Sequence, residues 1–205
     1  VLMSDGENLS AEHRSRIYRD IYDDSMWLIN LVENLLSITR MEGQGVHLHM
    51  ETELLEEVID EAMRHINRRH EHHTIKVNQI GDYILADMDA RLIIQVITNL
   101  VDNAVKYTPE GSTIMVNSRQ EGSSAVIDVS DNGPGIPDES KEKIFEMFYT
   151  TGHKSADGKR GMGLGLPLCR AILSAHRGTI EVLDNKPAGS IFRLTLPAKE
   201  VSLHE

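Results

Sequence analysis

What this 205-residue sequence lacks excludes several classes of protein. Cys169 is the single cysteine, so no internal disulfide can form, which is typical of a reducing compartment. No apolar run is long enough to cross a bilayer and nothing resembles a signal peptide, so we expect no membrane contact from this piece. The formal net charge of −11 argues against nucleic acid as a partner, because phosphate binding needs a basic face.

Apolar residues recur with two different periods along the chain, which predicts helices and strands mixed in one fold. We expect an α/β two-layer sandwich, with helices on one face of a mixed sheet. We divide the chain into a helical appendage (1–42), a main domain (43–200) and a tail (201–205). Strands are predicted at 46–52, 74–78, 83–86, 113–120, 124–130, 179–183 and 190–196, and helices at 10–40, 54–70 and 89–106 and after Gly165.

The first helix is long and apolar along one side. Its apolar positions alternate spacings of four and three, which forms a heptad seam that Asp24 interrupts. One interpretation is an amphipathic helix packed on its own domain, and the other is one helix of a dimeric four-helix bundle. We favour the bundle, because so long an apolar stripe needs partners. The seam is formed by Ile17, Ile21, Leu28, Leu31, Leu35 and Ile38.

The helix at 89–106 has a buried-type apolar face and a polar stripe. Helical geometry aligns Gln95, Asn99, Asn103 and Lys106 in that stripe. An Asn carbonyl oxygen is a hard ligand suited to Mg²⁺, and a Lys can act as a point charge for phosphate oxygens. The stripe therefore suits a Mg-triphosphate, although a solvated outer face would show the same pattern.

A glycine run follows the strand at 124–130. The chain passes directly into Asp131-Asn132-Gly133-Pro134-Gly135. A carboxylate fixed at a strand end can accept a hydrogen bond from an exocyclic amino group, and glycines let the backbone approach a flat base closely. An ordinary turn is the alternative interpretation.

A second glycine run, Gly161-Met162-Gly163-Leu164-Gly165, opens the last helix. A glycine-rich helix N-terminus presents free N–H groups and the positive end of the helix dipole to phosphates. No Gly-Lys-Ser/Thr follows, so it is not a Walker loop, and no strand leads into it as in a dinucleotide fingerprint. The long segment 138–160 before it is predicted to be a lid over the pocket.

Four motifs in this order resemble those of sensor histidine kinases. Residues 99–109 resemble their N box, 131–135 their first glycine box, 145–148 their phenylalanine box and 161–166 their second glycine box. The resemblance extends from about Ser10 to Pro197, and the residues around the motifs are similar to those of the KdpD-type, potassium-responsive branch. It implies the ATP-binding fold shared with gyrase and Hsp90, called the GHKL or Bergerat fold, in a cytoplasmic domain of a membrane-anchored bacterial sensor.

The resemblance also implies a role for each motif residue. Asn103 would hold Mg²⁺, Lys106 would reach a phosphate, Tyr107 would flank the adenine and Asp131 would accept from its amino group. Phe145 and Phe148 would anchor the lid. The other ATP contacts expected are Asn99, Gly133, Gly135, Ile136, Phe148, Lys154, Gly161, Gly163, Leu164, Gly165 and Leu166.

The phosphoacceptor histidine of such kinases has no counterpart among the ten histidines here, since none has the acidic residue and proline that follow it in the family. We therefore expect a piece of a longer protein that begins between the two dimerisation helices. The family implies a homodimer and a response regulator as partners. The cluster His65, His70, His72 and His73 could bind a metal, but we interpret it as a helix end and loop.

Three functional classes follow from the pocket. The first is the ATP-binding catalytic domain of a histidine kinase, the second a related ATPase or protein-serine kinase, and the third a scaffold that binds no nucleotide. Relatives in the second class place Glu where this chain has Asn99, because attack by water or a hydroxyl benefits from a general base. A neutral imidazole is already nucleophilic, so Asn99 favours the first class.

Overall fold

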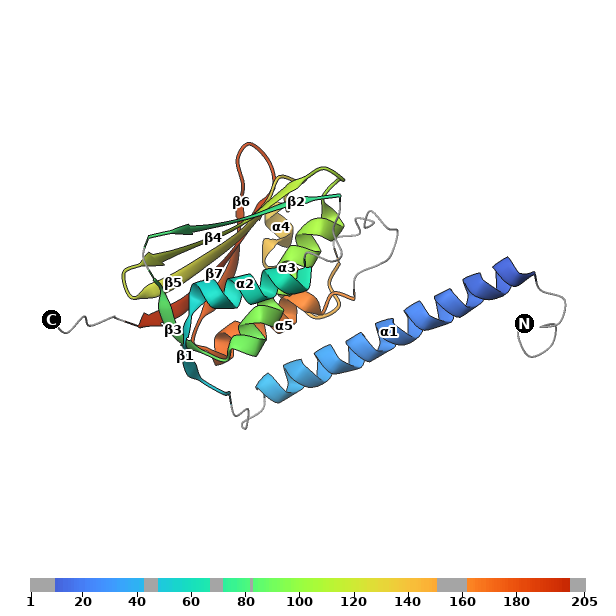
Figure 1. The fold of residues 1–205 in the computed structure, drawn as a ribbon, viewed down its shortest axis with the longest axis horizontal. Coiled ribbons are helices and arrows are strands. Elements are labelled where there is room, and N and C mark those ends of the chain that lie inside the picture. The colour runs from blue at the N-terminus through green and yellow to red at the C-terminus, as the bar shows by residue number, and fades with distance from the viewer. Residues whose placement is uncertain (1–9, 43–47, 67–71, 82, 151–161, 200–205) are drawn as a thin grey trace.

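The computed structural model describes residues 10–42, 48–66, 72–81, 83–150 and 162–199, and Figure 1 shows their arrangement. The helices are α1 (Ala11–Glu42), α2 (Leu55–Ile66), α3 (Ala90–Tyr107), α4 (Asp138–Lys141) and α5 (Gly165–Ala175), with the 3-10 helix η2 (Lys143–Phe145). The strands are β1 (Glu51–Leu54), β2 (Thr74–Ile80), β3 (Leu85–Met88), β4 (Thr113–Glu121), β5 (Ser124–Asp131), β6 (Thr179–Asp184) and β7 (Ser190–Lys199).

The strands form one mixed sheet in the order β1-β3-β7-β5-β4-β2, with β6 paired to β7. Every pair is antiparallel except β2 with β4. Helices α2, α3 and α5 cover one face of this sheet (Figure 1). The predicted two-layer α/β sandwich is therefore confirmed, whereas the division at residues 42 and 200 stays a prediction.

The core lies between the three covering helices and the sheet. The apolar face predicted for α3 is buried, and the inward side chains of β4 and β5 complete the contact. Such burial is the main stabilising contribution to a two-layer fold. The residues of this contact are Ile93, Val96, Ile97, Leu100, Val101, Ala104, Ile114, Val116, Ile127 and Val129.

Two short strands differ from their predicted positions. β1 spans Glu51–Leu54 rather than 46–52, and residues 46 and 47 lie outside the described residues. β3 spans Leu85–Met88 rather than 83–86, and Tyr83 is exposed. The pairing of Glu51 with Met88 and of Leu54 with Leu85 fixes both strands. The ends of such short strands depend on their pairing with distant strands, and the local alternation of apolar and polar residues does not determine that pairing.

Ser10 caps helix α1, since its Oγ accepts a hydrogen bond from the His13 N–H at 3.2 Å. The seam on α1 divides into two parts. Ile38 is only 1% exposed and belongs to the core of the domain, and Leu31 packs partly buried against it. By contrast, Leu28 remains 53% exposed. The C-terminal part of α1 thus packs on its own domain, and the rest of the seam stays available for a partner.

His176 joins the start of α3 to the end of α5. Its Nε2 accepts a hydrogen bond from the Asp89 N–H at 3.0 Å, so its Nδ1 carries the proton and donates to the Ile172 carbonyl at 2.7 Å. The Asp89 carboxylate in turn accepts a hydrogen bond from the His49 N–H at 3.1 Å. These bonds fix the first turn of α3, and with it the register of its polar stripe.

The exposed part of the α1 seam predicts weak, concentration-dependent self-association in solution. Each fully buried apolar side chain contributes roughly 1.5–3 kcal/mol, while association costs about 4–15 kcal/mol, so the two nearly offset. Sedimentation equilibrium should show dimer at high micromolar concentration, and Leu28→Gln should restore monomer. A parent chain that stays strictly monomeric would contradict this prediction.

We also predict that His176→Phe lowers the free energy of unfolding by about 1–3 kcal/mol, because the half-buried Asp89 N–H loses its acceptor. Urea unfolding of the variant measures this change. His65→Phe, at an exposed position on α2, is the matched control and should leave stability nearly unchanged. Equal stability of the two variants would show that the His176 bridge contributes nothing.

Candidate functional site

A cavity of about 390 Å³ lies between α3, the end of β5, residues 134–137 and the start of α5. Its volume is within the range of small-ligand sites. Most of the residues predicted from the motifs meet here, namely Asn99, Asn103, Lys106, Tyr107, Asp131, Gly135, Ile136, Gly163, Gly165 and Leu166.

Helix α3 supplies the polar wall of the cavity. Asn99, Asn103 and Lys106 of the predicted stripe line this cavity, whereas Gln95 lines a neighbouring cavity. A Cβ added to Gly165 would still lie 4.0 Å from Asn103 Nδ2, so the space beside this amide is open. The Lys106 ammonium lies 5.2 Å from the centre of the Tyr107 ring, and burial raises the pKa of Tyr107.

Asp131 is the buried carboxylate of the site, with 7% of its surface exposed. Its Oδ1 accepts hydrogen bonds from the N–H groups of Gly133 at 2.8 Å and Ser190 at 3.3 Å. Burial raises the pKa of Asp131, although the two backbone bonds oppose this shift. Among the described residues, every fully buried side-chain oxygen has a hydrogen-bond partner. Asp131 lines the cavity and its Oδ2 accepts no such bond, so Oδ2 is exposed to the cavity.

Two glycines shape the loop after Asp131. A Cβ at Gly133 would lie 2.6 Å from Thr108 Cγ2, and Gly135 has φ +78°, which favours glycine. Gly135 lines the cavity, whereas Gly133 packs behind it against Thr108 and Asp131. The glycines therefore bring backbone, not side chains, to this end of the cavity.

The turn between β6 and β7 supports Asp131 from behind. Asn185 Nδ2 donates to the Asp131 carbonyl at 2.7 Å, and the Asn185 N–H donates to the Gly189 carbonyl at 3.0 Å. A Cβ at Gly189 would lie 1.9 Å from the Asp131 carbonyl oxygen, so the two segments touch through backbone. The turn fixes the carboxylate at the end of β5.

The second glycine run lies at the opposite end of the cavity. A Cβ at Gly163 would lie 2.6 Å from the Tyr149 carbonyl, because the run packs on the backbone after η2. Gly165 and Leu166 line the cavity at the start of α5, whereas Leu164 is fully buried in the core. Gly161 lies outside the described residues.

The phenylalanine pair has two different environments. Phe145 is buried, and the Arg170 guanidinium lies 4.2 Å from the centre of its ring. Phe148 is 60% exposed and does not line the cavity, and its role as a lid anchor stays a prediction because residues 151–161 lie outside the described residues. The Phe148 N–H donates to the Gly163 carbonyl at 2.9 Å. Lys154 lies outside the described residues.

Several lining residues were not predicted from the sequence. Ser190 and Phe192 enter from β7 because that strand pairs with β5 in the register Ser130↔Ile191. Their position depends on this long-range strand pairing, which no local sequence motif predicts. The others are Asn34, Asp102, Ala104, Thr108, Pro134, Pro137, Ile144, Tyr149, Thr150 and Met162.

Thr108 and His73 close the C-terminal end of α3. The Thr108 hydroxyl donates to the Ala104 carbonyl at 2.7 Å, so His73 Nε2 must donate to the hydroxyl oxygen, 3.1 Å away. His65 lies apart from this contact, against Glu61 on α2, and His70 lies outside the described residues. In the described chain no three His, Cys, Asp or Glu side chains cluster as a metal site.

Cys169 lies directly behind the site. Its thiol is fully buried, with Asn99 Nδ2 3.9 Å from the sulfur, and burial raises the pKa of Cys169 to about 12. A thiol with so high a pKa carries no thiolate near neutral pH, so Cys169 is a packing residue rather than a nucleophile.

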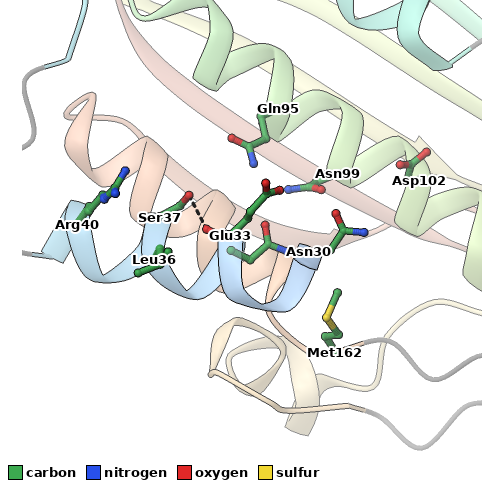
Figure 2. Close-up of a pocket in the computed structure, with 10 residues that line it drawn as sticks. Asn30, Glu33, Leu36, Ser37, Arg40, Gln95, Asn99, Asp102 and Met162 are labelled. Carbon is green, nitrogen blue, oxygen red and sulfur yellow. Dashed lines mark hydrogen bonds between the residues drawn. The ribbon is translucent and has the colours of Figure 1, made fainter. Parts of the chain in front are cut away.

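A second cavity of about 560 Å³ lies between α1 and α3 and joins the first. Figure 2 shows Glu33 on α1 directed toward Asn99 on α3, with Asn30 beside it and Arg40 farther along α1. Asn34, Asn99, Asp102 and Met162 line both cavities. Nothing in the sequence of α1 predicted that it borders the site.

The described helices do not include any that is both long and apolar enough to cross a bilayer.

Comparison with known proteins identifies the family of the chain. The family model for histidine kinase-, DNA gyrase B-, and HSP90-like ATPases matches residues 88–200, which is more than half of the chain. Sensor protein KdpD of Clostridium acetobutylicum is 38% identical over 197 residues, which cover 96% of this chain and 22% of that protein.

Solved structures of histidine kinases superpose on the chain including α1. Histidine kinase ThkA, in complex with the response regulator protein TrrA, is 26% identical with a TM-score of 0.77, over 96% of this chain and 55% of that one. The Acinetobacter baumannii histidine kinase AdeS shares the fold at 24% identity and a TM-score of 0.77, over 97% of this chain and 91% of that one. The chain belongs to the family of histidine kinase-, DNA gyrase B- and HSP90-like ATPases, as the catalytic domain of a sensor histidine kinase.

Proposed function

We propose that the chain binds Mg-ATP in the 390 Å³ cavity and presents the γ-phosphate for transfer to a histidine elsewhere in the whole protein. One observation supports this most strongly. A buried acceptor at the end of β5 faces, across one cavity, the amide and ammonium stripe of α3 and the start of α5. The cavity thus offers separate groups of residues to the base, to the metal ion and to the phosphates.

The adenine would lie at the Asp131 end. Asp131 Oδ2 would accept a hydrogen bond from the exocyclic amino group, while Ile136 and Phe192 offer apolar surface to the ring. Guanine carries a carbonyl where adenine carries this amino group. Two facing acceptors leave buried groups unpaired, at a cost of roughly 1–3 kcal/mol, so the site should prefer ATP to GTP.

The triphosphate would lie toward Asn103 and the start of α5. Asn103 lines the cavity, and its amide oxygen suits Mg²⁺, which takes few protein ligands and completes its shell with phosphates and water. When bound, Mg²⁺ would offset the charge of the phosphate oxygens. Lys106 would supply a positive charge, and the N–H groups near Gly163 and Gly165 would donate to phosphate oxygens.

The phosphoryl acceptor would be an imidazole. Asn99 lines the cavity where an ATPase or protein-serine kinase would need a carboxylate base, and an amide cannot take a proton from water or a hydroxyl. A neutral imidazole needs no such base. ThkA has been solved with a response regulator, so a response regulator is the partner we propose for the whole protein here. We also propose that the whole protein is a homodimeric, membrane-anchored sensor.

Radiolabelled ATP and the full-length protein test this function directly. The label should be acid-labile and base-stable, as phosphohistidine is, whereas phosphoserine has the reverse stability. The 205-residue chain alone should bind Mg-ATP without becoming labelled, because none of its histidines has the acceptor motif. Acid-labile label on this chain, or base-labile label on the full protein, would contradict the proposal.

We predict that Asp131→Asn weakens ATP binding by roughly 1–3 kcal/mol, because an amide donor would then face the adenine amino group. The same change should leave the free energy of unfolding unchanged or slightly higher at neutral pH. The raised pKa of Asp131 means that folding disfavours its ionised form, and Asn removes this cost. Calorimetry with ATP and GTP, together with urea unfolding, measures both effects.

Asp138→Asn, at an exposed position on α4, is the matched control and should leave nucleotide binding unchanged. The pH dependence provides a second check. ATP affinity of the parent should fall on acidification at a pH above the ordinary aspartate pKa, since the protonated carboxyl is a poorer acceptor. Equal affinity of the parent for ATP and GTP would refute the role of Asp131.

A further inference from the structure

Helix α1 reaches the phosphate end of the nucleotide cavity. The residues common to this cavity and the α1–α3 groove include Asn34 on α1 and Asn99 on α3. Asn99 is one helical turn from Asn103, the proposed magnesium ligand, and lies on the side away from Asp131. In the proposed orientation of the nucleotide, the opening between the two cavities therefore lies beside the terminal phosphates, and α1 borders it.

Asn34 is held at this opening by the packing of its own helix. Ile38, one turn later on α1, is 1% exposed and part of the domain core, and Leu31, one turn earlier, packs against that core. Asn34 is half-buried and lies between these two contacts. The packing of α1 thus fixes the backbone that carries Asn34, so its amide can reach the cavity without the cost of ordering a flexible segment.

Glu33 brings a negative charge to the same place. Figure 2 shows its carboxylate directed across the groove toward Asn99. Asp102 and Arg40 also line the groove, so charges of both signs are present. Glu33 is exposed, and its interaction with phosphates is screened over about 10 Å at 0.1 M salt, so we expect a modest repulsion.

We propose that α1 completes the triphosphate site: the Asn34 amide donates to the terminal phosphate, and the Glu33 carboxylate weakens binding of that phosphate. This inference rests on nucleotide binding in the adjoining cavity. Two neighbouring residues of one helix then act in opposite directions on ATP. By reciprocity, any movement of α1 changes ATP affinity, and bound ATP changes the position that α1 prefers.

Calorimetry of the 205-residue chain with Mg-ATP and with AMP, at low salt, tests the inference. Asn34→Ala should raise the Kd for ATP about tenfold, as expected for a lost hydrogen bond to a charged group. Glu33→Gln should lower the Kd for ATP about threefold, and neither change should alter the Kd for AMP. Both substitutions keep good helix formers in α1, and Glu12→Gln in its first turn is the matched charge control.

The outcomes separate the inference from the proposed function. A parent chain that binds no Mg-ATP would overturn both. A parent that binds Mg-ATP, with both variants unchanged or both shifted in the same direction, would overturn the role of α1 alone. Equal effects on ATP and AMP would also overturn it, because they would indicate a general structural change rather than phosphate contacts.

Discussion

The hydrogen bonds from the backbone N–H groups of Gly133 and Ser190 to Asp131 Oδ1 hold a buried carboxylate at the end of β5. Burial disfavours the ionised form of Asp131, and these two hydrogen bonds stabilise that form. The β5–β7 pairing brings Ser190 alongside, and the Asn185 amide holds the Asp131 backbone from the β6–β7 turn. The sheet thus sets both the position and the acceptor character of the carboxylate that we propose for base recognition.

The opposite end of the cavity is built from helices. The His176 bridge fixes the first turn of α3 against α5, so the amide stripe of α3 and the glycine start of α5 keep a constant relation. Helix α1 joins this arrangement through Ile38, which is buried in the domain core. A rigid adenine end and a phosphate end bordered by a separate helix would let the position of that helix govern how the γ-phosphate is held and released.

Much of this arrangement could be predicted from the sequence, because the period of apolar residues and the spacing of motif residues are local features of the chain. Three residues of the α3 stripe, the carboxylate at the end of β5 and the glycine start of α5 meet in one cavity as predicted. The contributions of Ser190, Asn185 and Asn34 could not be predicted, since they depend on strand register and helix docking. The exposure of Phe148 could not be predicted either: the family resemblance implied a lid anchor, whereas the side chain is 60% exposed on a backbone with φ +64°.

The central claim is that one cavity holds base, metal and phosphates in the order Asp131, Asn103, Asn99. A crystal structure of the chain with Mg²⁺ and a non-hydrolysable ATP analogue tests it most directly. We predict the adenine amino group within hydrogen-bond distance of Asp131 Oδ2, Mg²⁺ on the Asn103 oxygen, and the γ-phosphate at the opening toward Asn34. A nucleotide bound elsewhere, or in this cavity with its base away from Asp131, would contradict the account.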